Sequence, residues 1–295
     1  MKKTYLLILA GIVAITAGST WVRQSSAPTL MTRKVAGNIY MVFGADDKPD
    51  TFTGGNIALS VGDDGVVMVD SKMPPVVDQI SAAIEKLGGA SPKYLLNTHV
   101  HGDHTGGNPH FHPHSTIVAQ ENVRKRLVAD KPADTWPVIT FDNSLSIYMN
   151  GEQIEAVHYP KSHTDGDAVI YFTNSHVVHM GDLFFNGMLP FIDLDSGGTV
   201  QGYKKHVKEI LEKVPDDVAI IPGHGALATK ADLTKYARML DETVSLVTGK
   251  MNQGKSLEEI QKEGIQQEWQ AWSWYFITVD KWIDTIYKSY SVQQE

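Results

Sequence analysis

Four side chains that bind metal ions readily are crowded into NTHVHGDHTGGN, residues 97–108 of the chain: His99, His101, Asp103 and His104. Side chains repeat every two residues along an extended segment, so His99 and His101 are predicted to lie on the same side and reach one ion. Gly102 follows His101 and lets the chain turn, which directs Asp103 and His104 toward a second metal position next to the first. The pattern H-x-H-x-D-H therefore predicts a turn that supplies two metal ions.

Three further metal-binding residues each follow a predicted strand. They are His163 in YPKSHTDGD, Asp182 in VVHMGDLFFNG and His224 in IIPGHGAL. Any one of them alone is explained equally well as a turn residue or a helix cap. Together they supply what the first motif lacks, which is a third ligand for each ion and a carboxylate shared between the two ions.

The other histidines are predicted to have structural roles. His110, His112 and His114 alternate with proline and are expected in an exposed loop, although an auxiliary metal site is the alternative. We expect core or edge positions in strands for His158, His176 and His179, and a helix surface for His206.

Short apolar strands with a few helices between them must position these residues. Runs rich in β-branched and aromatic residues predict strands at 38–44, 55–61, 65–71, 93–99, 145–151, 153–160, 168–174, 176–182 and 217–223. Apolar residues at helical spacing predict helices at 74–87 and 200–214. Two strand-rich halves with interleaved helices predict a layered α/β architecture. From Lys230 the chain is predicted to be mostly helical. The stretch 268–290 carries an aromatic stripe and is expected to be a helix that packs these aromatics on the sheet rather than binding a cofactor.

With these motifs in this order, the chain resembles the metallo-β-lactamase superfamily from about Gly37 to Leu227. The resemblance implies an α/β fold, a four-layered αβ/βα sandwich of the metallo-β-lactamase type with extra C-terminal helices. It implies a metallo-β-lactamase-like domain at residues 28–229 and a helical extension at 230–295 that packs on the same domain.

The resemblance also implies how the ligands divide. His99, His101 and His163 would hold the first ion, Asp103, His104 and His224 the second, and Asp182 would bridge them. Two zinc ions per chain are expected, and iron or manganese suits the same donors. Asp70 would support a metal ligand without binding the ion itself, with capping or turn formation as the competing explanation. The set has a bridging aspartate and no cysteine, so it is more like glyoxalase II and lactonases than true class B β-lactamases.

Such a centre predicts a metal-dependent hydrolase of small molecules. A hydroxide bridging two ions would attack an ester, thioester, lactone or amide, β-lactams included, while Asp103 or Asp182 orients it and passes a proton. The alternatives are a mononuclear iron enzyme similar to sulfur dioxygenases and a non-catalytic zinc-binding protein of the same fold. Residues 184–198 and 44–56 are candidate pocket walls, unless Phe184, Phe185 and Phe191 only close the core.

The N-terminal residues 1–27 are typical of a signal peptide. Lys2 and Lys3 precede the apolar run YLLILAGIVAITAG, which favours a periplasmic or secreted protein, or a membrane-anchored one if the leader is not cleaved. Removing residues 1–27 makes the net charge of −8 three units more negative, which disfavours a nucleic-acid partner. The chain has no cysteine, which excludes disulfides, thiolate ligands and a lipidated cysteine.

Overall fold

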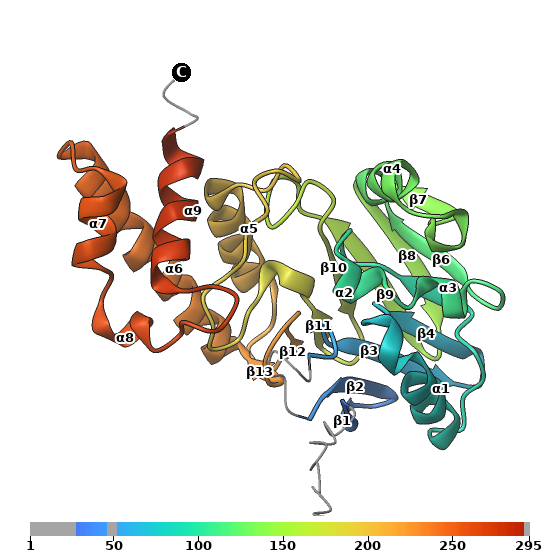
Figure 1. The fold of residues 1–295 in the computed structure, drawn as a ribbon. Helices are drawn as coiled ribbons and strands as arrows, with labels where there is room; N and C mark the ends of the chain where they lie inside the picture. Colours follow the sequence, from blue (N-terminus) through green and yellow to red (C-terminus); the bar gives the residue numbers. More distant parts are fainter. Residues whose placement is uncertain (1–27, 46–51, 292–295) are drawn as a thin grey trace, which may run out of the picture.

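The computed structural model describes residues 28–45 and 52–291, in which two β-sheets face each other and carry helices on their outer sides (Figure 1). The expected leader at residues 1–27 and residues 46–51 of the expected pocket loop lie outside the described residues. Within the described ranges, no helix is both long enough and apolar enough to cross a membrane.

The first sheet has seven strands in chain order. They are β1 (Leu30–Ala36), β2 (Ile39–Gly44), β3 (Ile57–Gly62), β4 (Gly65–Val69), β5 (Tyr94–Leu96), β6 (Thr116–Gln120) and β7 (Ile139–Phe141). Strands β1 to β4 pair antiparallel, whereas β4 to β7 pair in parallel. The carboxyl ends of the parallel strands therefore meet at one edge, where the first metal motif follows β5.

The second sheet has six strands in the order β13-β12-β11-β10-β9-β8. They are β8 (Ser144–Met149), β9 (Glu152–His158), β10 (Ala168–Phe172), β11 (Val177–His179), β12 (Ala219–Ile221) and β13 (Ala228–Thr229). Strands β11 and β12 are its parallel pair among the described strands, and each is followed by a predicted metal ligand.

The longer helices are α1 (Val77–Lys86), α4 (Glu121–Asp130), α5 (Val200–Lys213), α6 (Lys230–Asn252), α7 (Leu257–Glu263) and α9 (Val279–Ser291). The shorter turns of helix are η1 (Pro74–Val76), α2 (Gly102–Thr105), α3 (Asn108–Phe111), η2 (Ala133–Thr135), η3 (Gly181–Leu183) and α8 (Gln267–Gln270). Helices α5 to α9 lie beyond the second sheet, on the left of Figure 1, and α1 lies on the opposite side.

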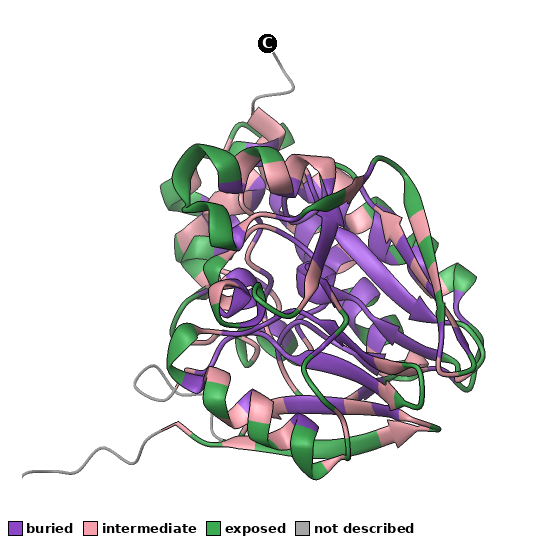
Figure 2. Ribbon diagram, turned by 90° about the vertical axis from the view of Figure 1, so that its right-hand side faces the viewer, coloured by how far each residue is buried: buried purple, intermediate pink, exposed green. Residues whose placement is uncertain are grey.

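Alternating strand residues build separate cores on the two faces of each sheet. Val67 and Val69 of β4 pack between the sheets, whereas Val66 and Met68 pack outward near Ile80 of α1. On β10, alternate residues likewise face the inter-sheet core or the core under α5, α6 and α9. Figure 2 shows the buried residues following the strands of both sheets. This order of helix, sheet, sheet and helix confirms the predicted four-layered sandwich.

Three local predictions were wrong. The stretch 268–290 is not one helix, because α8 ends at Gln270 and α9 begins at Val279. His206 is buried in α5, where its Nδ1 lies 2.6 Å from Ser162 Oγ and the hydroxyl satisfies it. His176 lies in the turn before β11 with φ +50°, and its imidazole contacts the exposed Asp217.

Candidate metal centre

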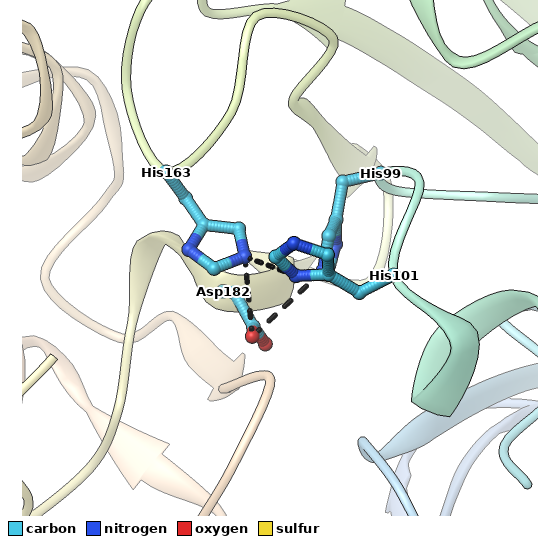
Figure 3. Close-up of side chains that lie close together, drawn as sticks. All are labelled: His99, His101, His163 and Asp182. Carbon is cyan, nitrogen blue, oxygen red and sulfur yellow. Dashed lines mark hydrogen bonds and ion pairs between the residues drawn. The ribbon is translucent and has the colours of Figure 1, made fainter. Parts of the chain in front are cut away.

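All seven residues singled out as metal ligands converge at the ends of the two sheets. Their donor atoms form two groups, and within each group the atoms lie no more than 4.8 Å apart. One group is His99, His101, His163 and Asp182 (Figure 3), and the other is Asp103, His104 and His224. Each group takes residues from the loop after β5 and from loops of the second sheet.

The path of the first motif differs from the expected extended segment. Strand β5 ends at Leu96, and the chain bends from Thr98 onward. The buried carboxylate of Asp70 accepts hydrogen bonds from Thr98 N and Thr98 Oγ1, each at 2.8 Å, and fixes this bend. The rings of His99 and His101 still approach each other, with centroids 4.9 Å apart and planes at 88°. The two imidazoles therefore converge because of a pinned bend and not because of strand alternation.

Asp182 stands between the two groups. Its Oδ2 lies 3.5 Å from His163 Nε2 and 3.8 Å from His99 Nε2. Its Oδ1 lies 3.1 Å from His104 Nε2 and 3.4 Å from His224 Nε2. One oxygen thus faces each group, which is the arrangement that a carboxylate shared by two ions requires.

Hydrogen bonds at the Nδ1 atoms of three of the imidazoles fix the orientation of their rings. His104 Nδ1 lies 2.7 Å from Asp70 Oδ2, so the expected supporting role of Asp70 has its contact. His163 Nδ1 lies 2.8 Å from the carbonyl oxygen of Phe191, and His99 Nδ1 lies 3.0 Å from Thr98 Oγ1. In each case the other nitrogen, Nε2, is left to face the centre.

Asp193 is a supporting residue that the sequence did not reveal. Its Oδ2 lies 2.9 Å from His101 Nε2, so His101 turns its Nδ1 toward the centre, 2.9 Å from His163 Nε2. Asp193 is 92 residues away from His101 in the chain. The carboxylate lies in FIDLD, inside a segment predicted only to wall the pocket, and no local pattern marks it.

The donors fit a metal centre because their buried polar atoms lack other partners. Among the described residues, His99 Nε2, His104 Nε2 and Asp182 Oδ1 are buried and accept or donate no hydrogen bond. Burying a polar atom without a partner is costly, and three such atoms facing one point suit the binding of a cation. Nitrogen and carboxylate donors together suit zinc, iron or manganese.

The charges of the site follow from burial and from the close carboxylates. Burial lowers the pKa of His163 to about 4 and that of His99 well below its usual value, so both imidazoles are neutral and keep a lone pair. Burial opposes the charge of His224 as well, but Asp182 and Asp103 raise its pKa to about 9. Burial would raise the pKa of Asp182, yet the imidazoles of His104 and His224 hold it well below its usual value. Ionised carboxylates and neutral imidazoles are the forms that bind a cation. The close carboxylates also raise the pKa of His104 well above its usual value, so His104 and His224 must each release a proton when an ion binds.

Two glycines let the backbone pass close to the donors. A Cβ at Gly55 would lie 2.1 Å from His104 Cε1, and a Cβ at Gly223 would lie 2.0 Å from Asp182 Oδ1. Larger residues at either position would displace a donor, so the glycines are required by close approach.

A cavity of about 730 Å³ opens onto the centre, and His101, Asp103, Asp182 and His224 form part of its lining. Its aromatic lining consists of Phe52, Phe185, Phe191, Trp274, Tyr275 and Phe276. The phenylalanines of the predicted wall segment, residues 184–198, therefore have two different roles. Phe185 and Phe191 reach the cavity, whereas Phe184 packs 4.9 Å from the ring of Tyr236 in the core. The contribution of residues 274–276 was not predicted.

The histidines of NPHFHPHST take no part in either donor group. His110, His112 and His114 are exposed, as expected for a loop, although His110 lies on the short helix α3. Its Nε2 lies 3.1 Å from Ser81 Oγ.

Comparisons with known proteins agree with this geometry. A hydroxyacylglutathione hydrolase, described as probable, from Schizosaccharomyces pombe is 30% identical over 138 residues, 44% of this chain and 47% of the relative. A type 2 metallo-beta-lactamase from Elizabethkingia meningoseptica is 24% identical over 234 residues, 76% of this chain and 88% of the relative. The chain spans less than half the length of the first curated relatives it matches, 40% and 47%.

A solved metallo-beta-lactamase from Pontibacter korlensis superposes with a TM-score of 0.63 at 17% identity, covering 72% of this chain and 99% of that one. This likeness shows the fold. Residues 50–246 also match the family described as the Metallo-beta-lactamase superfamily, which is more than half of the chain. The chain therefore belongs to the metallo-β-lactamase superfamily.

Proposed function

We propose that the protein is a dinuclear, zinc-dependent hydrolase of small molecules. His99, His101 and His163 would hold one ion, Asp103, His104 and His224 the other, and Asp182 would bind both. The observation that carries this proposal is the position of Asp182, whose two oxygens face the two groups at 3.1 to 3.8 Å. Family membership supports a hydrolase, since the matched relatives include proteins named as a probable hydroxyacylglutathione hydrolase and a metallo-beta-lactamase.

Two bound divalent ions would supply Lewis acidity and lower the pKa of water enough to make a nucleophile near neutral pH. The chain's own residues then position the reaction. Asp182 is only 4% exposed and is held between four imidazoles, which suits it to fix the centre. Asp103 is 20% exposed, lines the cavity and lies 3.3 Å from His224. Asp103 is thus the carboxylate that can reach a substrate and accept or return a proton.

The substrate contains a carbonyl group that water can attack, in an ester, thioester, lactone or amide. The complete second group of Asp103, His104 and His224 favours two ions over the single iron of a dioxygenase. The unpaired buried donors argue against a scaffold that binds no metal.

Metal analysis combined with a hydrolysis panel tests the proposal. The protein is stripped with chelator, reloaded with zinc, iron or manganese, and assayed on matched ester, thioester, lactone and β-lactam substrates. Two zinc ions per chain with activity restored by zinc, and lost in His101→Ala, is the expected result. One iron per chain with oxygen consumption supports the dioxygenase instead, and two zincs without any hydrolysis supports the binding protein.

We also propose that the protein is exported to the periplasm or secreted, on the strength of the leader pattern at residues 1–27. Cell fractionation with N-terminal sequencing of the mature chain tests this. A mature chain beginning at Met1 in a membrane fraction contradicts cleavage. The acidic net charge supports a small-molecule substrate over nucleic acid.

A further inference from the structure

A break in the C-terminal helices brings an aromatic segment to the mouth of the metal cavity. Helix α8 ends at Gln270 and α9 begins at Val279, and the non-helical residues between them include Trp274, Tyr275 and Phe276. All three line the cavity of about 730 Å³, which is also lined by four of the seven metal-ligand candidates. The C-terminal extension therefore contributes directly to the space that a substrate would occupy.

The segment is held against the loop that follows Asp182. Trp274 Nε1 donates to the carbonyl oxygen of Leu189 at 2.9 Å, and Leu189 N donates to the carbonyl oxygen of Trp272 at 2.9 Å. Trp274 N also donates to the carbonyl oxygen of Ile277 at 3.1 Å. These bonds fix the backbone of the segment relative to the metal centre, so its side chains form a defined wall.

The wall contacts His224 of one donor group directly and reaches His101 of the other group through Phe191. The ring of Trp274 lies 6.4 Å from that of His224, and Phe276 lies 5.2 Å from Phe191. Phe191 in turn stacks on His101 with ring centroids 5.6 Å apart. Aromatic surface thus extends from both ion positions outward.

The outer part of the wall is partly exposed among the described residues. Tyr275 is 48% exposed and Phe276 is 42% exposed, although both are large aromatic residues that line the cavity. Rings that filled the core would be buried, as Trp269 and Trp282 are at 0%. Exposed rings beside a reaction centre are positioned to contact a bound molecule.

The scarcity of cationic side chains in the cavity lining also favours an apolar substrate over a highly charged one. Among the described residues lining it, the acidic ones are Asp103 and Asp182, which are metal-ligand candidates, and Lys131 is the one lysine or arginine. Lys281 lies nearby, but its Nζ donates to the carbonyl oxygen of Phe276 at 3.2 Å and lies 4.0 Å from that ring. A substrate with several carboxylates would find few cations to pair with in this lining.

We propose that residues 274–276 make this site selective for substrates with a large apolar, preferably aromatic, acyl group. The proposal rests on the proposed hydrolase function for its chemistry, and it goes beyond that function by naming the acyl class. The bond cleaved is the acyl carbon to heteroatom bond. Water supplies the oxygen of the acid product and the proton of the leaving group.

A thioester series with one leaving group tests the selectivity. Acetyl, butyryl and phenylacetyl thioesters of N-acetylcysteamine vary only in the acyl group, and the lactoyl thioester of the same thiol is the polar comparator. We expect kcat/KM to be highest for the phenylacetyl thioester. Phe276→Ala should lower it about three- to tenfold for that substrate, from the loss of one aromatic contact, and change the acetyl thioester by less than twofold.

Matched variants separate the wall from general effects. Tyr275→Ala removes an exposed tyrosine at the cavity, and Tyr148→Ala removes a 73% exposed tyrosine on β8 that does not line it. Only Tyr275→Ala should alter acyl preference. Phe276→Leu keeps an apolar side chain without the ring and should give an intermediate preference even if Phe276→Ala lowers the melting temperature.

Binding measured by calorimetry distinguishes the two possible failures. The probe is the phenylethyl thioether of N-acetylcysteamine, in which a CH₂ group replaces the carbonyl. If no substrate of the ester, thioester, lactone and β-lactam panel is hydrolysed, but the probe binds and Phe276→Ala weakens binding threefold or more, the proposed hydrolase function is contradicted and the role of the aromatic wall is supported. Hydrolysis with equal preference for all acyl groups, or with the lactoyl thioester as the best substrate, contradicts the proposed selectivity but not the proposed hydrolase function.

Discussion

The bond between Asp70 and His104 provides the most direct test of how the proposed second ion is held. Asp70 Oδ2 lies 2.7 Å from His104 Nδ1, and the carboxylate also accepts from Thr98 N and Thr98 Oγ1. All three residues are buried. The carboxylate requires His104 Nδ1 to carry the proton, which leaves Nε2 with the lone pair that an ion needs.

We expect Asp70→Asn to reverse this tautomer. The backbone N–H of Thr98 can only donate, so the asparagine oxygen must stay at Oδ1 and the NH₂ group must take the place of Oδ2. That NH₂ group then donates to His104 Nδ1 and shifts the proton to Nε2. Asparagine tolerates the φ of +64° at this position, so the backbone is unaffected.

The expected loss of affinity for one ion is about 10- to 100-fold, which corresponds to about 1.4–2.8 kcal/mol. Zinc titration against a competing chelator measures it, with metal per chain counted by mass spectrometry. The control is Asp216→Asn, the same replacement at a carboxylate that is 99% exposed. A folded Asp70→Asn protein that binds two zincs at the wild-type affinity would refute the tautomer argument.

Four further outcomes are expected. Asp193→Asn should weaken the other ion about tenfold in the same titration, because His101 loses the carboxylate behind it; unchanged binding of both ions would contradict this. Gly223→Ala should abolish metal retention, since its Cβ would lie 2.0 Å from Asp182 Oδ1, whereas Gly249→Ala, with nothing within 4 Å, should retain the metal. Chelation should lower the melting temperature by roughly 5–10 °C relative to protein in zinc at 100 times Kd, as scanning calorimetry would reveal. Hydrolysis should fall below roughly pH 6, because protons compete with the ions for imidazole nitrogens; a flat profile down to pH 5 would argue otherwise.

The layered fold was predictable because its signals are local. On β4, Val66 and Met68 face one side while Val67 and Val69 face the other, and such apolar runs bounded by glycine and aspartate predict buried strands. The motif at residues 97–104 was readable for the same reason, since four of the donors are close in the chain.

The parts that were missed depend on contacts between distant residues. Asp193 and His101 are 92 residues apart, and Ser162 and His206 are 44 apart. Neither pairing can be recognised from a repeating pattern of residues in the sequence. The aromatic stripe at 268–290 continues through residues 271–278, which suggested one helix. The hydrogen bond from Trp274 to Leu189 instead holds that stretch in a loop.

Each donor group draws on both sheets, so neither half of the chain holds a complete set for either ion. His99 and His101 need His163 from the second half, as Asp103 and His104 need His224. The free energy of metal binding therefore also stabilises the association of the N-terminal half of the fold with the C-terminal half. An ion would bind tightly only when both halves are correctly assembled. The metal content of a preparation would therefore measure the fraction of the protein that has folded correctly.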